Sequence, residues 1–232
     1  MPTHPNANQS LTARNTGNSP RLARLALTAV LAFGALGAGA RTALDFFATM
    51  PVERFNLFSP ATRLDMIDYW NAGLQNPSSN VFGGKSRILS ATDGSMDVLV
   101  GKNSILTLAV VPNGGDTLIA LVETVKTPTP DSSIAFYGAS DWSERRVKTP
   151  TFADFLMPEA KKAKLGAADY PQMDFRTVTY DPETGIFTFR DRTAEHYSTP
   201  EGTPEEIPAL KFIRPELRRV VKGGKLVAPE KK

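Results

Sequence analysis

SRILSATDGSMDVLVGKNSILTLAVVPNGGDTLIALVETV, residues 86–125, consists of four runs rich in Val, Ile, Leu and Thr, separated by short breaks. Two of the breaks contain Asp93-Gly94 and Asn113-Gly114, dipeptides that suit tight hairpin turns because such turns require positive φ. Alternating apolar runs joined by these turns predict an antiparallel meander.

The sequence after the meander predicts further strands, most of them paired in hairpins. A further strand is predicted at residues 132–137, and an irregular segment follows at 138–172 with a short helix near 152–156. Two more hairpins are expected, and residues 198–208 between them are Pro-rich and acidic, which is typical of an exposed loop. The hairpin strands are expected at residues 174–180, 186–190, 216–221 and 225–227.

Two helices are predicted before the meander. The first is capped by Thr42 and ends at Met50-Pro51, because a residue that precedes proline avoids helical geometry. The second starts at Ser59-Pro60, where Ser caps and Pro fits the first helical position, and it stops at Gly73. Its expected buried face consists of residues spaced three to four apart: Leu64, Ile67, Trp70 or Asn71, and Leu74.

These elements together predict an α+β domain over residues 41–227, followed by a frayed tail at 228–232. We expect an antiparallel sheet of about eight strands, with the two N-terminal helices packed on one face. Antiparallel sheets commonly leave the other face solvated, so that face would be available for binding.

Residues 1–40 read as a secretory signal peptide. A polar region with Arg14, Arg21 and Arg24 precedes the uncharged apolar run 25–40, which ends in Ala38-Gly39-Ala40. A basic start, an apolar middle and an A-x-A exit are the three parts of a cleavable signal. The alternative is an uncleaved anchor, but a span needs roughly 20 apolar residues and this run is shorter. We therefore expect a periplasmic or secreted protein with no stable membrane span after cleavage.

Cleavage changes the charge of the chain. The whole sequence has a net charge of +3, and residues 1–40 carry three cations and no acid, so the mature chain is neutral. A neutral domain gives no reason to expect nucleic acid as a partner. The chain has no cysteine, which excludes thiol catalysis, Cys-ligated metal and a lipid anchor on cysteine.

Several motifs resemble parts of catalytic sites, but each lacks residues that such a site requires. Gly84-Lys85-Ser86 resembles the end of a phosphate-binding loop, but Ser79 stands where that motif requires Gly, so a simple turn into a strand is expected. Asp65 with Asp68, and Asp93 with Asp97, lack further acids nearby, so solvated carboxylates are expected, with Arg63 as an alternative partner of the helical pair. His196 is the single imidazole after residue 40, and it is expected at the surface.

Aromatic residues crowd the second half of the chain, where most are expected in the core. Trp142 and Phe152 lie in the irregular segment and are expected to be exposed. Together with Tyr170 they are the candidate contacts for a partner. No catalytic residue, metal ligand or cofactor is expected.

The sequence also resembles a known family. The stretches 63–100, 104–114 and 132–142, the GGKS turn at 83–86 and the terminal GGKLV at 223–227 are similar to domain-of-unknown-function family 3256, exported proteins of Gram-negative anaerobes. The resemblance covers essentially the whole mature chain. It implies export and a compact α+β domain, and it brings no established activity.

The functional hypothesis is a non-enzymatic envelope protein that binds a protein, peptide or glycan. One alternative is an inhibitor or accessory subunit of an exported hydrolase. A carboxylate-based hydrolase is a further alternative, and it requires a pocket that holds two perturbed carboxyl groups.

Overall fold

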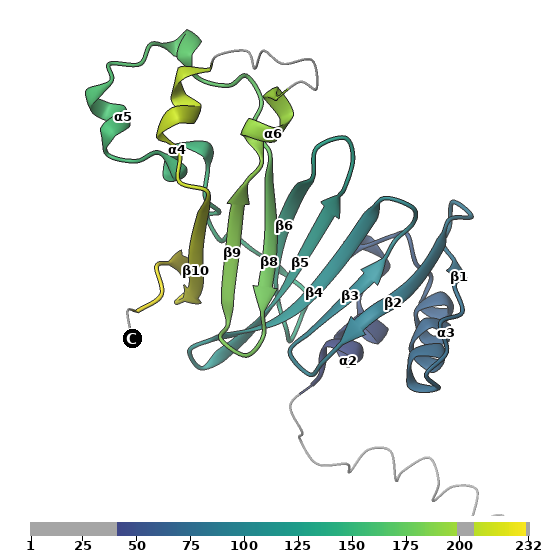
Figure 1. The fold of residues 1–232 in the computed structure, drawn as a ribbon. Coiled ribbons are helices and arrows are strands. Elements are labelled where there is room, and N and C mark those ends of the chain that lie inside the picture. Colours follow the sequence, from purple (N-terminus) through teal and green to yellow (C-terminus); the bar gives the residue numbers. More distant parts are fainter. Residues whose placement is uncertain (1–40, 199–206, 231–232) are drawn as a thin grey trace, which may run out of the picture. The chain divides into compact units, whose positions relative to one another are not determined.

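The computed structural model describes residues 41–198 and 207–230, in which the predicted α+β class is confirmed. The predicted signal peptide at 1–40, most of the predicted acidic loop and the last two residues of the tail lie outside the described residues. Figure 1 shows the strands side by side, with the N-terminal helices near the strands of residues 78–113 and three short helices beyond the ends of the strands Ile186–Asp191 and Glu216–Lys222.

The first sheet has seven strands in the order of the sequence, and every neighbouring pair is antiparallel. The predicted meander is therefore confirmed. The longest pairing joins β4 and β5 from Ser104 opposite Val125 to Asn113 opposite Asp116. Gly114 has a φ of 67°, the positive value that its turn requires. The strands are β1 (Ser78–Ser79), β2 (Lys85–Ala91), β3 (Ser95–Leu99), β4 (Ser104–Asn113), β5 (Asp116–Val125), β6 (Asp131–Gly138) and β7 (Glu144–Arg145).

The second sheet has four antiparallel strands in the order β11-β10-β9-β8. They are β8 (Arg176–Asp181), β9 (Ile186–Asp191), β10 (Glu216–Lys222) and β11 (Lys225–Val227). The expectation of one sheet of about eight strands is thus corrected to two sheets. The reason lies at the edge of β6, where β7 pairs with Phe136 and Tyr137, and β8 meets Ser132 through a side chain instead of a ladder.

Side-chain contacts fasten the second sheet to the first. The hydroxyl of Ser132 accepts a hydrogen bond from the Val178 N–H at 3.1 Å. The hydroxyl of Tyr180 donates to the carbonyl of Val110, also at 3.1 Å. Between the sheets lies a core that includes Phe136, Phe187 and Phe189. The second sheet therefore covers part of the face that we expected to be open.

The N-terminal helices cover the opposite face, as predicted. They are α2 (Ala43–Thr49) and α3 (Pro60–Asn71), with the 3₁₀ turn η2 (Val52–Arg54) between them. Thr42 and Asp45 form a reciprocal cap at the start of α2, and Ser59 caps α3. The core on this side combines helix residues such as Phe47 and Met66 with strand residues of the first sheet.

The expected buried face of α3 is confirmed only in part, because Ile67 and Trp70 pack against the core and the other two residues do not. Leu64 and Leu74 are 52% and 48% exposed, whereas Arg63 and Met66 are buried. Polar and apolar residues are spread almost evenly around α3, so its periodicity does not select one face. Contacts with α2, β1 and β2 decide its orientation instead.

Short helices make up most of the remaining chain. The predicted helix near 152–156 is confirmed as α4 (Phe152–Phe155). The sequence did not predict α5 (Glu159–Lys162), α6 (Thr193–Tyr197) or the 3₁₀ turns η3 (Ala167–Asp169) and η4 (Pro208–Phe212). In Figure 1, α4, α5 and α6 lie beyond the upper ends of β9 and β10.

Candidate binding surface

Trp142, predicted as an exposed contact, is 7% exposed and belongs to the core. Its ring packs edge-on against Phe46 at 6.3 Å and lies 6.0 Å from Tyr137. The positive φ of Trp142, 54°, closes a turn in which its N–H donates to Gly138 and directs the ring inward. The expectation of exposure was wrong because it treated an irregular segment as a solvated one.

The structure brings together the other two predicted contacts. The rings of Phe152 and Tyr170 meet edge to face, with centroids 6.4 Å apart. Phe152 is half-buried and Tyr170 is 37% exposed, so the pair forms a small aromatic contact with one accessible ring. Their role as partner contacts stays a prediction.

His196 stacks on the ring of Phe175, with centroids 4.1 Å apart. Its Nδ1 lies 3.3 Å from the hydroxyl of Thr129, and the neighbouring Glu195 is ion-paired with Arg192. In the part of the chain that the structure describes, His196 therefore has a threonine hydroxyl as its hydrogen-bonding partner and no serine–acid pair around it.

The carboxyl groups singled out from the sequence lie on two different parts of the fold: Asp65 and Asp68 on α3, and Asp93 and Asp97 in the β2–β3 hairpin. Asp65 and Asp68 are exposed on α3, as expected, and among the described residues neither forms an ion pair with the buried Arg63. Asp97 accepts hydrogen bonds from Ser90 and Thr107 on neighbouring strands of the first sheet.

One carboxyl group that the sequence did not reveal is perturbed. Burial raises the pKa of Asp191 above its ordinary value, and the nearby charge of Asp174 acts in the same direction. Asp191 accepts hydrogen bonds from the backbone and hydroxyl of Thr193, and Asp174 is ion-paired with Arg176. Both carboxyl groups are thus engaged in contacts that stabilise the local structure. Neither of them lines the clefts described below.

The turn formed by residues 80–84, between β1 and β2, is held by a network of hydrogen bonds. Asn80 is 9% exposed, and its side-chain oxygen accepts hydrogen bonds from the N–H groups of Phe82 and Gly84, each at 3.0 Å. Its side-chain nitrogen donates to the carbonyl of Val100 at 2.8 Å and to the hydroxyl of Ser86 at 3.3 Å. A buried side chain with all its polar atoms paired fixes the turn to the sheet.

The two glycines of this turn complete its geometry. Gly83 has a φ of 75°, which other residues rarely adopt. A Cβ on Gly84 would stand 2.8 Å from the amide nitrogen of Asn80, closer than van der Waals contact permits. The GGKS sequence is thus part of a tight turn into a strand, as predicted from the sequence.

The fixed turn presents apolar side chains to solvent. Phe82 is 83% exposed and Val81 is 58% exposed. The N–H of Val81 donates to the carbonyl of Leu57 at 3.1 Å, which also ties the turn to the segment before α3. Sequence reasoning missed Phe82, although an aromatic residue inside Asn-Val-Phe-Gly-Gly is a signal for a turn that displays a ring.

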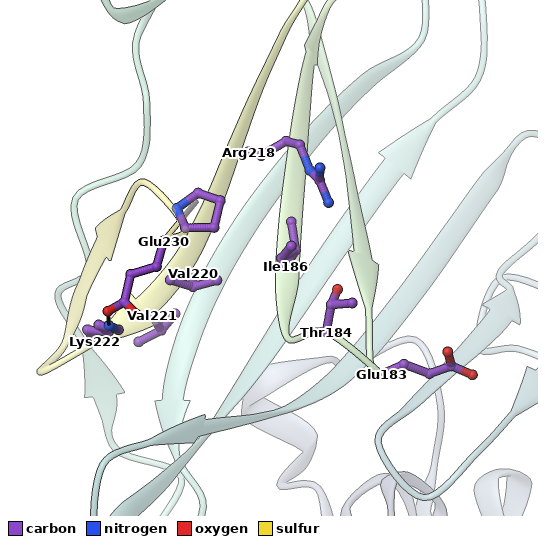
Figure 2. A pocket seen from close by; sticks show the side chains of 9 residues that line it. Glu183, Thr184, Ile186, Arg218, Val220, Val221, Lys222 and Glu230 are labelled. Atoms are coloured by element: carbon purple, nitrogen blue, oxygen red, sulfur yellow. Dashed lines mark hydrogen bonds and ion pairs between the residues drawn. The ribbon is translucent and has the colours of Figure 1, made fainter. Parts of the chain in front are cut away.

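A cleft of about 870 Å³ lies on the outer side of the second sheet, away from this turn (Figure 2). Thr184, Ile186 and Arg218 line one part of it, and the ion pair of Lys222 with Glu230, 2.5 Å long, stands at another edge. Part of the predicted frayed tail therefore folds back to form a wall of this cleft.

The sequence of this chain matches a family described as "Protein of unknown function (DUF3256)" over residues 35–210. The chain belongs to the DUF3256 family. This confirms the family that the sequence resembles, and it adds no activity. No curated protein matches the DUF3256 chain.

A solved structure supports the fold of this DUF3256 protein. The "domain of an uncharacterized protein from Porphyromonas gingivalis W83" is similar with a TM-score of 0.63 and 20% sequence identity. The match covers 83% of the DUF3256 chain and 100% of that chain. At this identity the likeness concerns the fold alone. Within the described residues, no helix is long and apolar enough to cross a membrane.

Proposed function

We propose that this DUF3256 protein is an exported, non-enzymatic binding module that docks on a protein partner through the 80–84 turn. Export rests on the signal-like residues 1–40. The docking role rests on one observation: Phe82 is 83% exposed at the tip of a turn that a buried asparagine holds in place.

Exposure alone would not support docking, because single apolar residues are common on protein surfaces. The turn differs because its exposed ring has an exposed apolar neighbour in Val81 and a backbone fixed at both ends. A fixed aromatic side chain loses little conformational freedom when it binds, so more of its interaction energy appears as affinity.

Burial of the Phe82 side chain in a partner would contribute a limited binding free energy. Full burial of a Phe side chain stabilises a complex by about 1.5–3 kcal/mol, which corresponds to roughly a tenfold to hundredfold change in the dissociation constant. Phe82 and Val81 suit an apolar pocket on a folded partner, and the N–H groups of Phe82 and Gly84 are already bonded to Asn80.

Crosslinking in envelope extract tests this proposal. The full chain and its Phe82→Ser variant are incubated with extract and a short crosslinker, and the adducts are quantified by mass spectrometry. We expect at least one discrete adduct that falls about tenfold in the variant. Met173→Ser is the matched control, because Met173 is 57% exposed in the segment before β8 of the second sheet, whereas the 80–84 turn joins β1 and β2 of the first sheet. Equal loss in both variants, or no loss in either, would contradict the proposal.

A further inference from the structure

A second cleft, of about 490 Å³, lies between residues 146–150 and the β10–β11 hairpin. The wall from the hairpin includes Arg219, the turn Gly223-Gly224, and Lys225. The opposite wall includes Arg146 and Lys148. The cleft is thus formed by segments that are far apart in the sequence.

The charges around this cleft are strongly unbalanced. Four cationic residues line it, together with the single carboxyl group of Asp154; the cations are Arg146, Lys148, Arg219 and Lys225. Within residues 41–198 and 207–230, none of the four forms an ion pair. The chain after residue 40 is neutral as a whole, so this concentration of positive charge is local.

Asp154 offsets one of the four positive charges at most, and its carboxylate is held at the start of α4. Its Oδ2 accepts hydrogen bonds from the N–H of Thr151 at 2.8 Å and from the Thr151 hydroxyl at 3.0 Å. The backbone hydrogen bond of Thr151 is the main cause that lowers the pKa of Asp154, and the charges of Lys148 and Arg219 also lower it. Those two cations therefore act on the same region of space.

The hairpin wall is held in place by the first sheet. Gly223 and Gly224 have φ values of 55° and 71°, and the N–H of Gly224 donates to the side-chain oxygen of Asn113 at 2.9 Å. Asn113 ends β4, so the hairpin turn is anchored to the β4–β5 turn. The two glycines have no side chains that would fill the cleft from this wall.

We propose that this cleft binds a small polyanion that carries two or more phosphate or sulfate groups. Four cations on two facing walls suit several tetrahedral oxyanion groups better than one. A volume of about 490 Å³ is within the ordinary range of small-molecule sites. This ligand site is separate from the 80–84 turn, and it does not depend on the docking role proposed for that turn.

Calorimetric titration of the full chain tests the site with two probes, inorganic tripolyphosphate and sucrose octasulfate. We expect at least one to bind at low ionic strength and to weaken as sodium chloride is added, because exposed charges are screened by salt. Binding of tripolyphosphate alone would identify a phosphate ligand, and binding of the octasulfate alone a sulfated one.

Charge reversal locates the binding. Lys148→Glu and Lys225→Glu should each weaken binding about tenfold or more, since each replaces an attraction by a repulsion. The matched control is Lys102→Glu, which makes the same charge change in the turn before β4, a strand length of about 30 Å from Asn113. Lys102→Glu should change the affinity less than about twofold.

Two results would overturn the proposal. One is the absence of measurable heat with both probes at low salt. The other is an equal loss of affinity in Lys102→Glu and in the two cleft variants, which would show attraction to net charge alone. All three lysines are exposed, and unfolding curves of the variants check that each still folds.

Discussion

The side-chain oxygen of Asn80 accepts a hydrogen bond from the N–H of Phe82 at 3.0 Å, so that a buried polar group fixes the residue that carries the most exposed aromatic ring of the described chain. Buried amides are retained where their hydrogen bonds specify one conformation. Here the specified conformation is a turn that displays Phe82.

Loss of the Asn80 side chain should destabilise the protein. Asn80→Ala leaves the carbonyl of Val100 and two N–H groups of the turn without their partners. Each unsatisfied buried group costs about 1–3 kcal/mol, and we expect a total loss of about 3 kcal/mol in urea unfolding. Asn103→Ala, which removes an exposed bond to Thr127, should cost under about 0.5 kcal/mol. Equal effects would show that Asn80 does not hold the turn.

The turn should also reject a side chain at Gly84. A Cβ there meets Asn80 at 2.8 Å, so Gly84→Ala should lower the free energy of unfolding by about 1–3 kcal/mol. Gly101→Ala is the control, because a Cβ at Gly101 meets nothing within 4 Å. Denaturation midpoints that shift alike in the two variants would be inconsistent with the close approach of Asn80.

Arg63 should be replaceable by an apolar residue. It is 2% exposed, and its Nε and Nη1 have no hydrogen-bond partner. Burial lowers the pKa of its guanidinium, because the charged form is less stable away from water when no partner compensates it. Arg63→Met should raise the free energy of unfolding by about 1–2 kcal/mol, whereas Arg63→Ala should lower it by leaving a cavity. If Met destabilised as much as Ala, Arg63 would have a stabilising role that these contacts do not explain.

Tyr180 should make stability depend on alkaline pH. Burial raises the pKa of its hydroxyl to about 12, and the charge of Asp181 adds to the effect. The folded state therefore keeps a proton that the unfolded state loses from about pH 10 upward, so stability falls as pH rises through this window.

The Tyr180→Phe variant measures that effect. At about pH 9 it should be less stable than the parent by about 1 kcal/mol, because the carbonyl of Val110 loses its donor. By about pH 11 this difference should shrink by about 1 kcal/mol. A difference that stays constant across this range would show that ionisation of Tyr180 does not lower the stability of the folded protein.

The signal peptide predicted at residues 1–40 implies where a mature chain would start. Mass spectrometry of the exported protein should find Arg41 at its N-terminus, after Ala38-Gly39-Ala40. Ala40→Phe should block cleavage and leave the precursor at the membrane. A mature protein that begins with Met1 would support the alternative of an uncleaved anchor.

Local chemistry in the sequence was sufficient to predict much of the fold. Ser59-Pro60 starts α3, Met50 ends α2, and Asn113-Gly114 closes the β4–β5 turn, because each depends on residues adjacent in the chain. The division into two sheets was not predictable in this way. It depends on the contact of Ser132 with Val178, which are 46 residues apart.

The candidate surface was predicted less well, because exposure depends on neighbours that are distant in sequence. Trp142 lies in an irregular segment yet is buried against Phe46, which is 96 residues earlier in the chain. Phe82 was missed because its exposure follows from the bond of Asn80 to Val100, twenty residues away.

The most direct measurement of the docking role is photocrosslinking from position 82 in cells that export the protein. A benzophenone analogue of phenylalanine replaces Phe82, and a second preparation carries it at Met173, which is 57% exposed elsewhere. We predict one adduct of discrete mass from position 82, no such adduct from position 173, and its loss when Asn80→Ala is added. An adduct of twice the chain's mass would identify a second copy as the partner. Equal adducts from both positions, or an adduct that survives Asn80→Ala unchanged, would contradict the account.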